Sequence, residues 1–164
     1  EQVRLASGRV QISGGSLPSW ESPAEWQVLD LALGDPNQDG RQELLIAVRK
    51  PDSSGVVLSH PFVFGYRQGT YRLLWGGSAV SDPILEVELG DIDADGKQEL
   101  IVLEELHGDM GRAVSVWRWH GWGFSQVWRS QPGAYERLRL GNDPQDGSRL
   151  ILIDRLPSAL QARS

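Results

Sequence analysis

Two short loops carry oxygen-bearing side chains at a spacing that suits a hard cation. They cover residues 35–43 and 91–99, with oxygen donors at loop positions 1, 3, 5 and 9 and glycine at position 6. Calcium takes about 6–8 oxygen ligands, and glycine permits the positive φ that turns a chain around the ion. We therefore expect two calcium sites, with backbone carbonyl ligands at position 7. The candidate ligand residues are Asp35, Asn37, Asp39, Arg41, Glu43, Asp91, Asp93, Asp95, Lys97 and Glu99.

The loops belong to an internal repeat. Comparable segments begin at residues 35, 91 and 142. Apolar and polar residues alternate before each loop, which is typical of a strand with one buried face. A nearly continuous apolar run follows each loop, as in Leu44–Val48 and Leu100–Leu103, and such runs suit strands buried on both faces.

The second half of each repeat is aromatic. Residues 64–75 match residues 117–128, and turn residues Gln68-Gly69 and Gly121–Gly123 divide each segment. Each segment therefore predicts a β-hairpin. With the two strands that flank the loop, one unit has four strands and roughly the size of a propeller blade.

The predicted fold is all-β, with about three four-stranded antiparallel, propeller-like units in one domain of residues 1–164. The expected units are residues 26–78, 84–130 and 135–156.

The last unit ends after its second strand. Near the N-terminus, Trp20-Glu21-Ser22 matches Trp128-Arg129-Ser130. We expect either that N-terminal strands within residues 1–22 complete the last unit, or that chains associate, for example as a two-chain ring of six blades. Either closure would hide sheet edges that otherwise invite pairing.

Residues 33–44 and 89–100, each a Leu-Gly-Asp start, an acidic glycine-containing loop and a Glu-Leu end, resemble the FG-GAP/VCBS-type repeats of integrin α-subunit propellers and related bacterial surface proteins. The resemblance covers residues 26–154. It implies calcium-stabilised blades and a role in adhesion or interaction. This chain has Glu at loop position 9, where the family more often has Asp.

The third loop, residues 142–150, departs further from the pattern. It has Pro144 at position 3 and Leu150 at position 9, so we expect a preserved turn without a metal ion.

Composition narrows the partners. The net charge of −6 disfavours nucleic acid, because phosphate binding needs a basic surface. No apolar run is long enough to span a membrane. Cysteine is absent, which does not fix the compartment, and the chain starts at Glu1 without Met, which a processed export signal or a trimmed chain would both explain. Calcium loops favour export, since extracellular modules can bind weakly where calcium is abundant, so we expect an extracellular, cell-surface or periplasmic location.

No catalytic arrangement stands out. His60, His107 and His120 lie far apart, and Glu104-Glu105 beside His107 is better explained as a solvated strand edge. We predict that the protein is not an enzyme but a calcium-stabilised β-repeat module for protein–protein or cell-surface interaction, including self-association.

The tryptophans leave two other functions open. Trp75 and Trp128 share one repeat position, and we expect both to pack in the core or between units. A cluster of Trp117, Trp119 and Trp122 at a hairpin tip could instead bind a glycan, which would indicate a carbohydrate-binding or carbohydrate-active domain. A third possibility is an accessory structural subunit of a larger complex.

Overall fold

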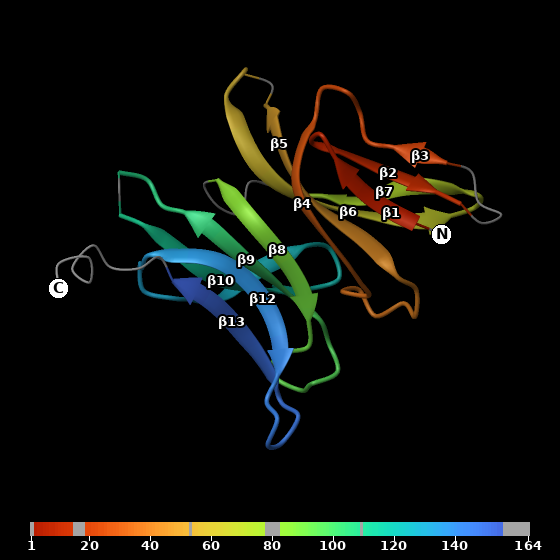
Figure 1. The fold of residues 1–164 in the computed structure, drawn as a ribbon. Helices are drawn as coiled ribbons and strands as arrows, with labels where there is room; N and C mark the ends of the chain where they lie inside the picture. The colour runs from red at the N-terminus through yellow and green to blue at the C-terminus, as the bar shows by residue number, and fades with distance from the viewer. Residues whose placement is uncertain (1, 15–18, 53, 78–82, 109, 156–164) are drawn as a thin grey trace.

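The chain folds into a series of antiparallel β-sheets that stack face to face (Figure 1). The computed structural model describes residues 2–14, 19–52, 54–77, 83–108 and 110–155. The regular secondary structure within these ranges consists of β-strands alone, and no helix occurs in them. The prediction of an all-β fold with four-stranded, blade-like units is confirmed.

Four sheets follow one another along the chain. The N-terminal sheet contains β1 (Gln2–Ala6), β2 (Arg9–Ser13) and β3 (Trp20–Glu21). The first four-stranded sheet contains β4 (Gln27–Gly34), β5 (Glu43–Pro51), β6 (Val57–Arg67) and β7 (Thr70–Gly76). The second four-stranded sheet contains β8 (Ile84–Gly90), β9 (Glu99–Glu105), β10 (Arg112–Trp119) and β11 (Phe124–Arg129). The C-terminal hairpin contains β12 (Tyr135–Asn142) and β13 (Arg149–Arg155).

The strands that follow the two acidic loops are buried on both faces, as their apolar runs predict. In β5, Ile46 packs toward the N-terminal sheet and Leu45 toward the second four-stranded sheet. In β9, Val102 packs toward the first four-stranded sheet and Ile101 toward the C-terminal hairpin. Alternate side chains point to opposite faces of a strand, so each of these strands joins two hydrophobic cores. This double burial fixes the C-terminal end of each acidic loop.

The N-terminal sheet repeats the outer half of a unit. Ser22 Oγ accepts a hydrogen bond from the Val10 amide at 3.1 Å, and Ser130 Oγ accepts one from the Val114 amide at 3.0 Å. The sequence match between the two segments is therefore a structural match of β2–β3 with β10–β11.

The N-terminal sheet packs against the first four-stranded sheet, however, at the opposite end of the stack from the C-terminal hairpin (Figure 1). The expectation that residues 1–22 complete the last unit within one chain is thus corrected. The physical reason is that Val10 and Ile12 provide an apolar face that matches the core of β5 and β6.

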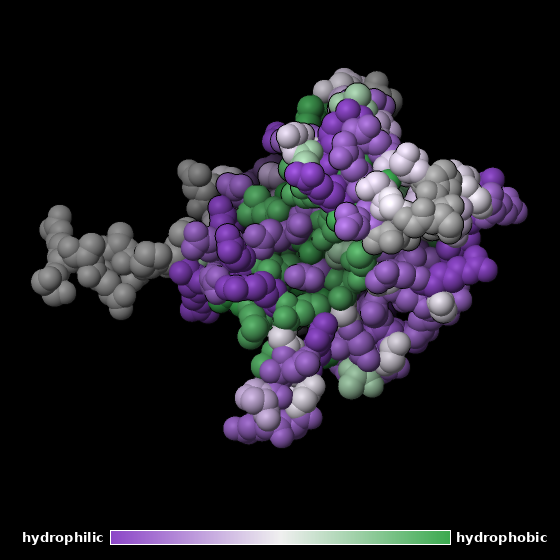
Figure 2. Space-filling view, turned by 45° about the vertical axis from the view of Figure 1, so that its right-hand side comes forward, coloured by the Kyte–Doolittle hydropathy of each residue, from purple (hydrophilic) through white to green (hydrophobic). Residues whose placement is uncertain are grey.

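The C-terminal hairpin keeps only the inner half of a unit. Among the described residues, β13 pairs with β12 alone. Leu152 is 46% exposed, whereas Leu45 and Ile101, which occupy the same repeat position, are fully buried. On the face drawn in Figure 2, hydrophobic residues gather in the middle and hydrophilic residues form the margins. The described part of the chain contains no helix long and apolar enough to cross a membrane.

Candidate metal centres

Each acidic loop joins the first two strands of a four-stranded sheet. The first runs from Gly34 at the end of β4 to Glu43 at the start of β5, and the second from Gly90 to Glu99. Gly40 and Gly96 have φ values of 78° and 85°, the positive values that the sequence predicts for loop position 6. Position 4 is also left-handed, although it holds Gln38 and Ala94 with φ values of 58° and 61°. The sequence gives no signal for that.

The first loop brings three carboxylates together. Ligand atoms of Asp35, Asp39 and Glu43 lie within 4.8 Å of one another. Asp35 accepts hydrogen bonds from the amides of Asp39 at 3.1 Å and Gly40 at 2.8 Å. These bonds bend the loop around its first carboxylate. Glu43, the first residue of β5, is 1% exposed.

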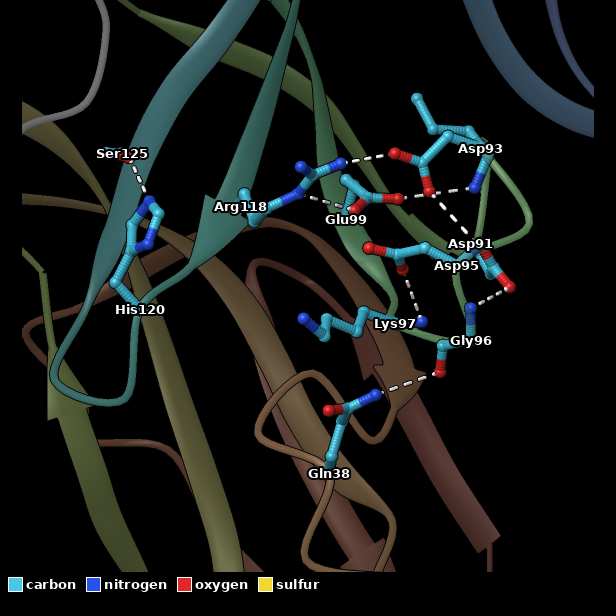
Figure 3. Close-up of polar contacts among 11 residues, drawn as sticks. Gln38, Asp91, Asp93, Asp95, Gly96, Lys97, Glu99, Arg118, His120 and Ser125 are labelled. Atoms are coloured by element: carbon cyan, nitrogen blue, oxygen red, sulfur yellow. Dashed lines mark hydrogen bonds and ion pairs between the residues drawn. The ribbon is translucent and has the colours of Figure 1, made fainter.

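The second loop repeats this arrangement with one change (Figure 3). Its triad is Asp91, Asp93 and Glu99, again within 4.8 Å of one another. Asp91 accepts hydrogen bonds from the amides of Asp95 at 3.2 Å and Gly96 at 2.9 Å. The triad therefore uses positions 1, 3 and 9 here, and positions 1, 5 and 9 in the first loop.

The other predicted ligands lie in the loops but outside the triads. Asn37 Oδ1 accepts a hydrogen bond from the Asp39 amide at 3.0 Å. Asp95 Oδ1 accepts one from the Lys97 amide at 2.8 Å, as Asp39 Oδ1 does from the Arg41 amide at 3.0 Å. Carbonyl coordination by Arg41 and Lys97 stays a prediction.

The sequence did not identify the arginines that enter both loops. Arg67 Nη2 lies 2.5 Å from Asp39 Oδ2 and 2.6 Å from Glu43 Oε1. Arg118 Nε lies 3.1 Å from Glu99 Oε1, and its Nη2 is paired with Asp93 Oδ2 (Figure 3). The sequence shows only that a basic residue lies at the end of the apolar third strand of each unit. Strand register decides which carboxylates that residue contacts.

These ion pairs shift the titration of the groups involved. Burial raises the pKa of Glu43, and the hydrogen bond from Arg67 partly offsets this rise. The hydrogen bond to Glu43 raises the pKa of Arg67, and the bond to Glu99 does the same for Arg118. Both arginines therefore stay charged at any physiological pH.

The residues present fit a divalent cation. All donors in the triads are carboxylate oxygens, the type that hard cations prefer. Glu43 Oε2 is buried and has no hydrogen-bond partner, although a buried carboxylate oxygen ordinarily has one. The triads are therefore sites that could hold a metal ion, and its role there would be to cross-link the loop and the strand.

The third loop is built differently. Asn142 Oδ1, at position 1, accepts a hydrogen bond from Arg149 Nη1 at 2.9 Å. Asp143 and Asp146 accept bonds from the amides of Gln145 and Ser148. Within the described residues, no third acidic triad forms there. That this loop holds no ion stays a prediction.

The two acidic loops also contact each other. Gln98 Oε1 accepts a hydrogen bond from the Asp35 amide at 2.7 Å, and Gln38 Nε2 donates one to the Gly96 carbonyl at 3.0 Å. A cavity of about 220 Å³ lies between the loops, and its lining includes Lys97, Arg118 and Trp119. The two candidate sites thus share one surface.

The tryptophans divide into packed and exposed side chains. Trp75 packs edge-on against Trp119 and Phe124, with ring centroids 6.0 and 5.4 Å apart. Trp117 is 9% exposed. Only Trp122 of the expected aromatic cluster stands out, with 81% of its surface exposed. Trp128 is 52% exposed, which corrects the expectation that it packs in the core or between units. Among the residues that the structure describes, no outer strands follow the C-terminal hairpin to cover it.

Glu104 differs from its prediction, and His120 forms a contact that the sequence did not predict. Glu104 is 1% exposed and forms an ion pair with Arg129 at 2.9 Å, so it is not part of a solvated edge. His120 Nε2 lies 2.5 Å from Ser125 Oγ across the hairpin turn, a local contact that fastens the tip.

Comparison of the chain with family models and with curated proteins finds no match. The interpretation of the two loops therefore depends on their own geometry.

Proposed function

We propose that the protein is a non-enzymatic β-repeat module in which two calcium ions stabilise the loops and the exposed surface binds a protein partner. The observation that carries the metal assignment is the repeated triad, Asp35/Asp39/Glu43 and Asp91/Asp93/Glu99, each with a fully buried glutamate. Calcium suits such loops better than magnesium, since it tolerates irregular oxygen geometry and higher coordination numbers. The FG-GAP/VCBS resemblance supports the same choice.

The ions would be structural. Three carboxylates within 4.8 Å repel one another, and an ion that binds only the folded form stabilises it by mass action. An extracellular, cell-surface or periplasmic location belongs to the same proposal, because weak calcium sites fill where calcium is abundant.

Thermal unfolding in calcium and in EGTA tests the metal assignment. Calcium should raise the melting temperature and EGTA should lower it. D93A/D95A should remove the contribution of the second loop and reduce the calorimetric stoichiometry from two ions to one. D143A/D146A in the third loop is the matched control and should leave the calcium response intact. A melting curve that calcium and chelator leave unchanged would refute the assignment.

An exposed apolar area supports the interaction role. Trp128 is half-exposed and lies at the junction of the second four-stranded sheet and the C-terminal hairpin. Two open cavities of about 240 and 340 Å³ line this junction and share Trp128 and Ile151. Exposed apolar surface of this kind is common where proteins associate.

Molar mass in solution tests self-association, which is the simplest form of the interaction proposal. A mass above the 18.2 kDa of one chain that falls in Trp128→Glu would support it. A mass of one chain at all concentrations would exclude self-association.

Glycan binding is the second candidate function, and Trp122 is the reason. Trp122 is 81% exposed, and the neighbouring Gly121 lines the cavity between the two loops. An exposed aromatic ring beside hydrogen-bonding groups is the combination that sugar recognition uses. Binding to a glycan panel should be lost in W122A and kept in W128A, and a panel without hits would remove this candidate.

A further inference from the structure

Each acidic triad already contains a cation, the guanidinium of an arginine. Arg67 bridges Asp39 and Glu43, and Arg118 bridges Asp93 and Glu99. In both cases the arginine engages the buried position-9 glutamate and one aspartate of the triad. The arginine side chains are only 18% and 33% exposed, so neither contact is a freely solvated surface pair.

The two arginines reach their triads from different strand positions. Gly65 lies opposite Glu43 in the β5–β6 pairing. In the β9–β10 pairing, Trp117 lies opposite Leu100, which places Arg118 at the position that corresponds to Gly65. Arg67 is two residues further along β6 and folds back over Gly65, where an added Cβ would lie 2.8 Å from Arg67 Nη1. Two different sequence solutions thus deliver the same charge to equivalent sites.

The guanidinium satisfies only part of the buried carboxylate. Glu43 Oε1 is bonded to Arg67, whereas Glu43 Oε2 is buried without a hydrogen-bond partner. An ionised carboxylate in such a place needs compensation on both oxygens. The unpartnered oxygen indicates that the site accommodates more positive charge than the arginine supplies.

We propose that Arg67 and Arg118 are built-in competitors of the metal ion. This inference rests on the proposed metal function and concerns its regulation. Without metal, each guanidinium offsets part of the negative charge of its triad and keeps the loop folded. A divalent ion needs the same carboxylate oxygens, and like charges a few ångströms apart repel strongly in a partly buried site. Metal binding therefore requires the guanidinium to leave the triad, which weakens the apparent affinity. The sites should fill only at high metal concentration.

Calorimetric titration with calcium chloride tests this at one site at a time. In the D93A/D95A background, which leaves the first loop as the only intact site, Arg67→Gln should bind calcium at least about tenfold more tightly. Arg67→Lys, which keeps a charge but loses the planar fork, should lie in between. Arg72→Gln in β7 is the matched control, because it removes the same charge from the same hairpin outside the triad. Its affinity should stay within about threefold of the background.

Thermal unfolding with and without calcium is a second measurement, and it shows whether the variant still folds. Without calcium, Arg67→Gln should melt below the background protein, and saturating calcium should restore it. If that variant is unfolded without calcium, Arg118→Gln in a D35A/D39A background provides the same comparison at the second loop. Equal affinity in the arginine variants and their backgrounds would overturn this inference alone. Absence of calcium binding in the unmodified protein and in every variant would overturn the proposed function as well.

Discussion

Gln98 Oε1 accepts a hydrogen bond from the backbone amide of Asp35 at 2.7 Å, so the second acidic loop holds the first residue of the first loop in place. Gln98 lies between Lys97 and Glu99, both candidate metal ligands. Its carboxamide lies across Gly34, where an added Cβ would stand 2.2 Å from Gln98 Oε1. The two candidate sites are therefore connected by a direct contact as well as by the sheets beneath them.

Replacing Gln98 should loosen the first loop. Q98A leaves the Asp35 amide without its acceptor, and we expect a loss of about 1–2 kcal/mol in the free energy of unfolding. Calcium affinity at the first loop should fall too, because Asp35 is a member of that triad. Urea denaturation and calorimetry measure the two effects. Q42A alters the same position of the first loop and is the matched control. Equal losses in the two variants would mean that the contact with Asp35 carries no special weight.

A second contact between units is repeated along the stack. Asp30 Oδ2 accepts a hydrogen bond from the Val87 amide at 2.9 Å, and Glu86 Oε2 accepts one from the Leu138 amide at 2.6 Å. Asp30 and Glu86 occupy the same repeat position, and the third unit has Arg137 there. The C-terminal hairpin therefore has no carboxylate acceptor at this repeat position.

Removing the acceptor at Asp30 should separate the loss of a hydrogen bond from the loss of a charge. Val87 is 2% exposed, so D30A leaves its amide buried and unpaired, at a cost of about 1–3 kcal/mol. D30N keeps an oxygen acceptor and should cost less at neutral pH. Urea denaturation of both variants checks this. If D30N is as unstable as D30A, the charge rather than the hydrogen bond is what matters.

The same carboxylate predicts a pH dependence. Burial raises the pKa of Asp30 above its ordinary value of 3.8, the Val87 hydrogen bond works against this rise, and the charge of Glu86 adds to it. A folded-state pKa above the unfolded value means that the folded protein holds the proton more tightly. The stabilisation from Asp30 is therefore full below pH 3.8 and is lost as pH rises through the folded pKa.

Unfolding measured from about pH 3 to pH 7 tests this sign. The natural protein should lose stability relative to D30N as pH rises across this range. The natural protein should likewise lose stability relative to E88Q as pH rises, since burial and then the charge of Asp30 raise the pKa of Glu88. A gap between the natural protein and D30N that stays constant with pH, or closes in the other direction, would contradict the raised pKa.

The local features of this fold could be predicted from the sequence. The strands on either side of the loops, the positive φ at Gly40 and Gly96 and the double burial of Leu44–Val48 follow from residue type and from period-two patterning. These features depend on neighbours within a few residues.

The features that could not be predicted from the sequence depend on contacts between distant parts of the chain. An apolar face such as that of Val10 and Ile12 can cover any matching sheet, and only the assembled fold selects the first one. The register of β5 against β6, in which Gly65 lies opposite Glu43, decides which carboxylates Arg67 meets, and residue type alone does not fix that register. Whether Trp128 is covered depends on outer strands, and none follows the C-terminal hairpin in the described part of the chain.

Trp75 and Trp128 allow the effect of covering a tryptophan ring with neighbouring strands to be measured. They occupy matching positions, opposite Val63 and Val116, each beside a β-bulge. Trp75 packs against the rings of Trp119 and Phe124, whereas Trp128 is 52% exposed.

W75A should therefore lower the free energy of unfolding by about 3 kcal/mol, and W128A by less than about 1.5 kcal/mol. Urea denaturation at low protein concentration checks the single chain. Because the two residues are both tryptophan and occupy matching register positions in the corresponding strands β7 and β11, the difference between the losses reports what covers each ring. Equal losses would mean that Trp128 is covered in solution, and the loss in W128A should then shrink as the protein is diluted.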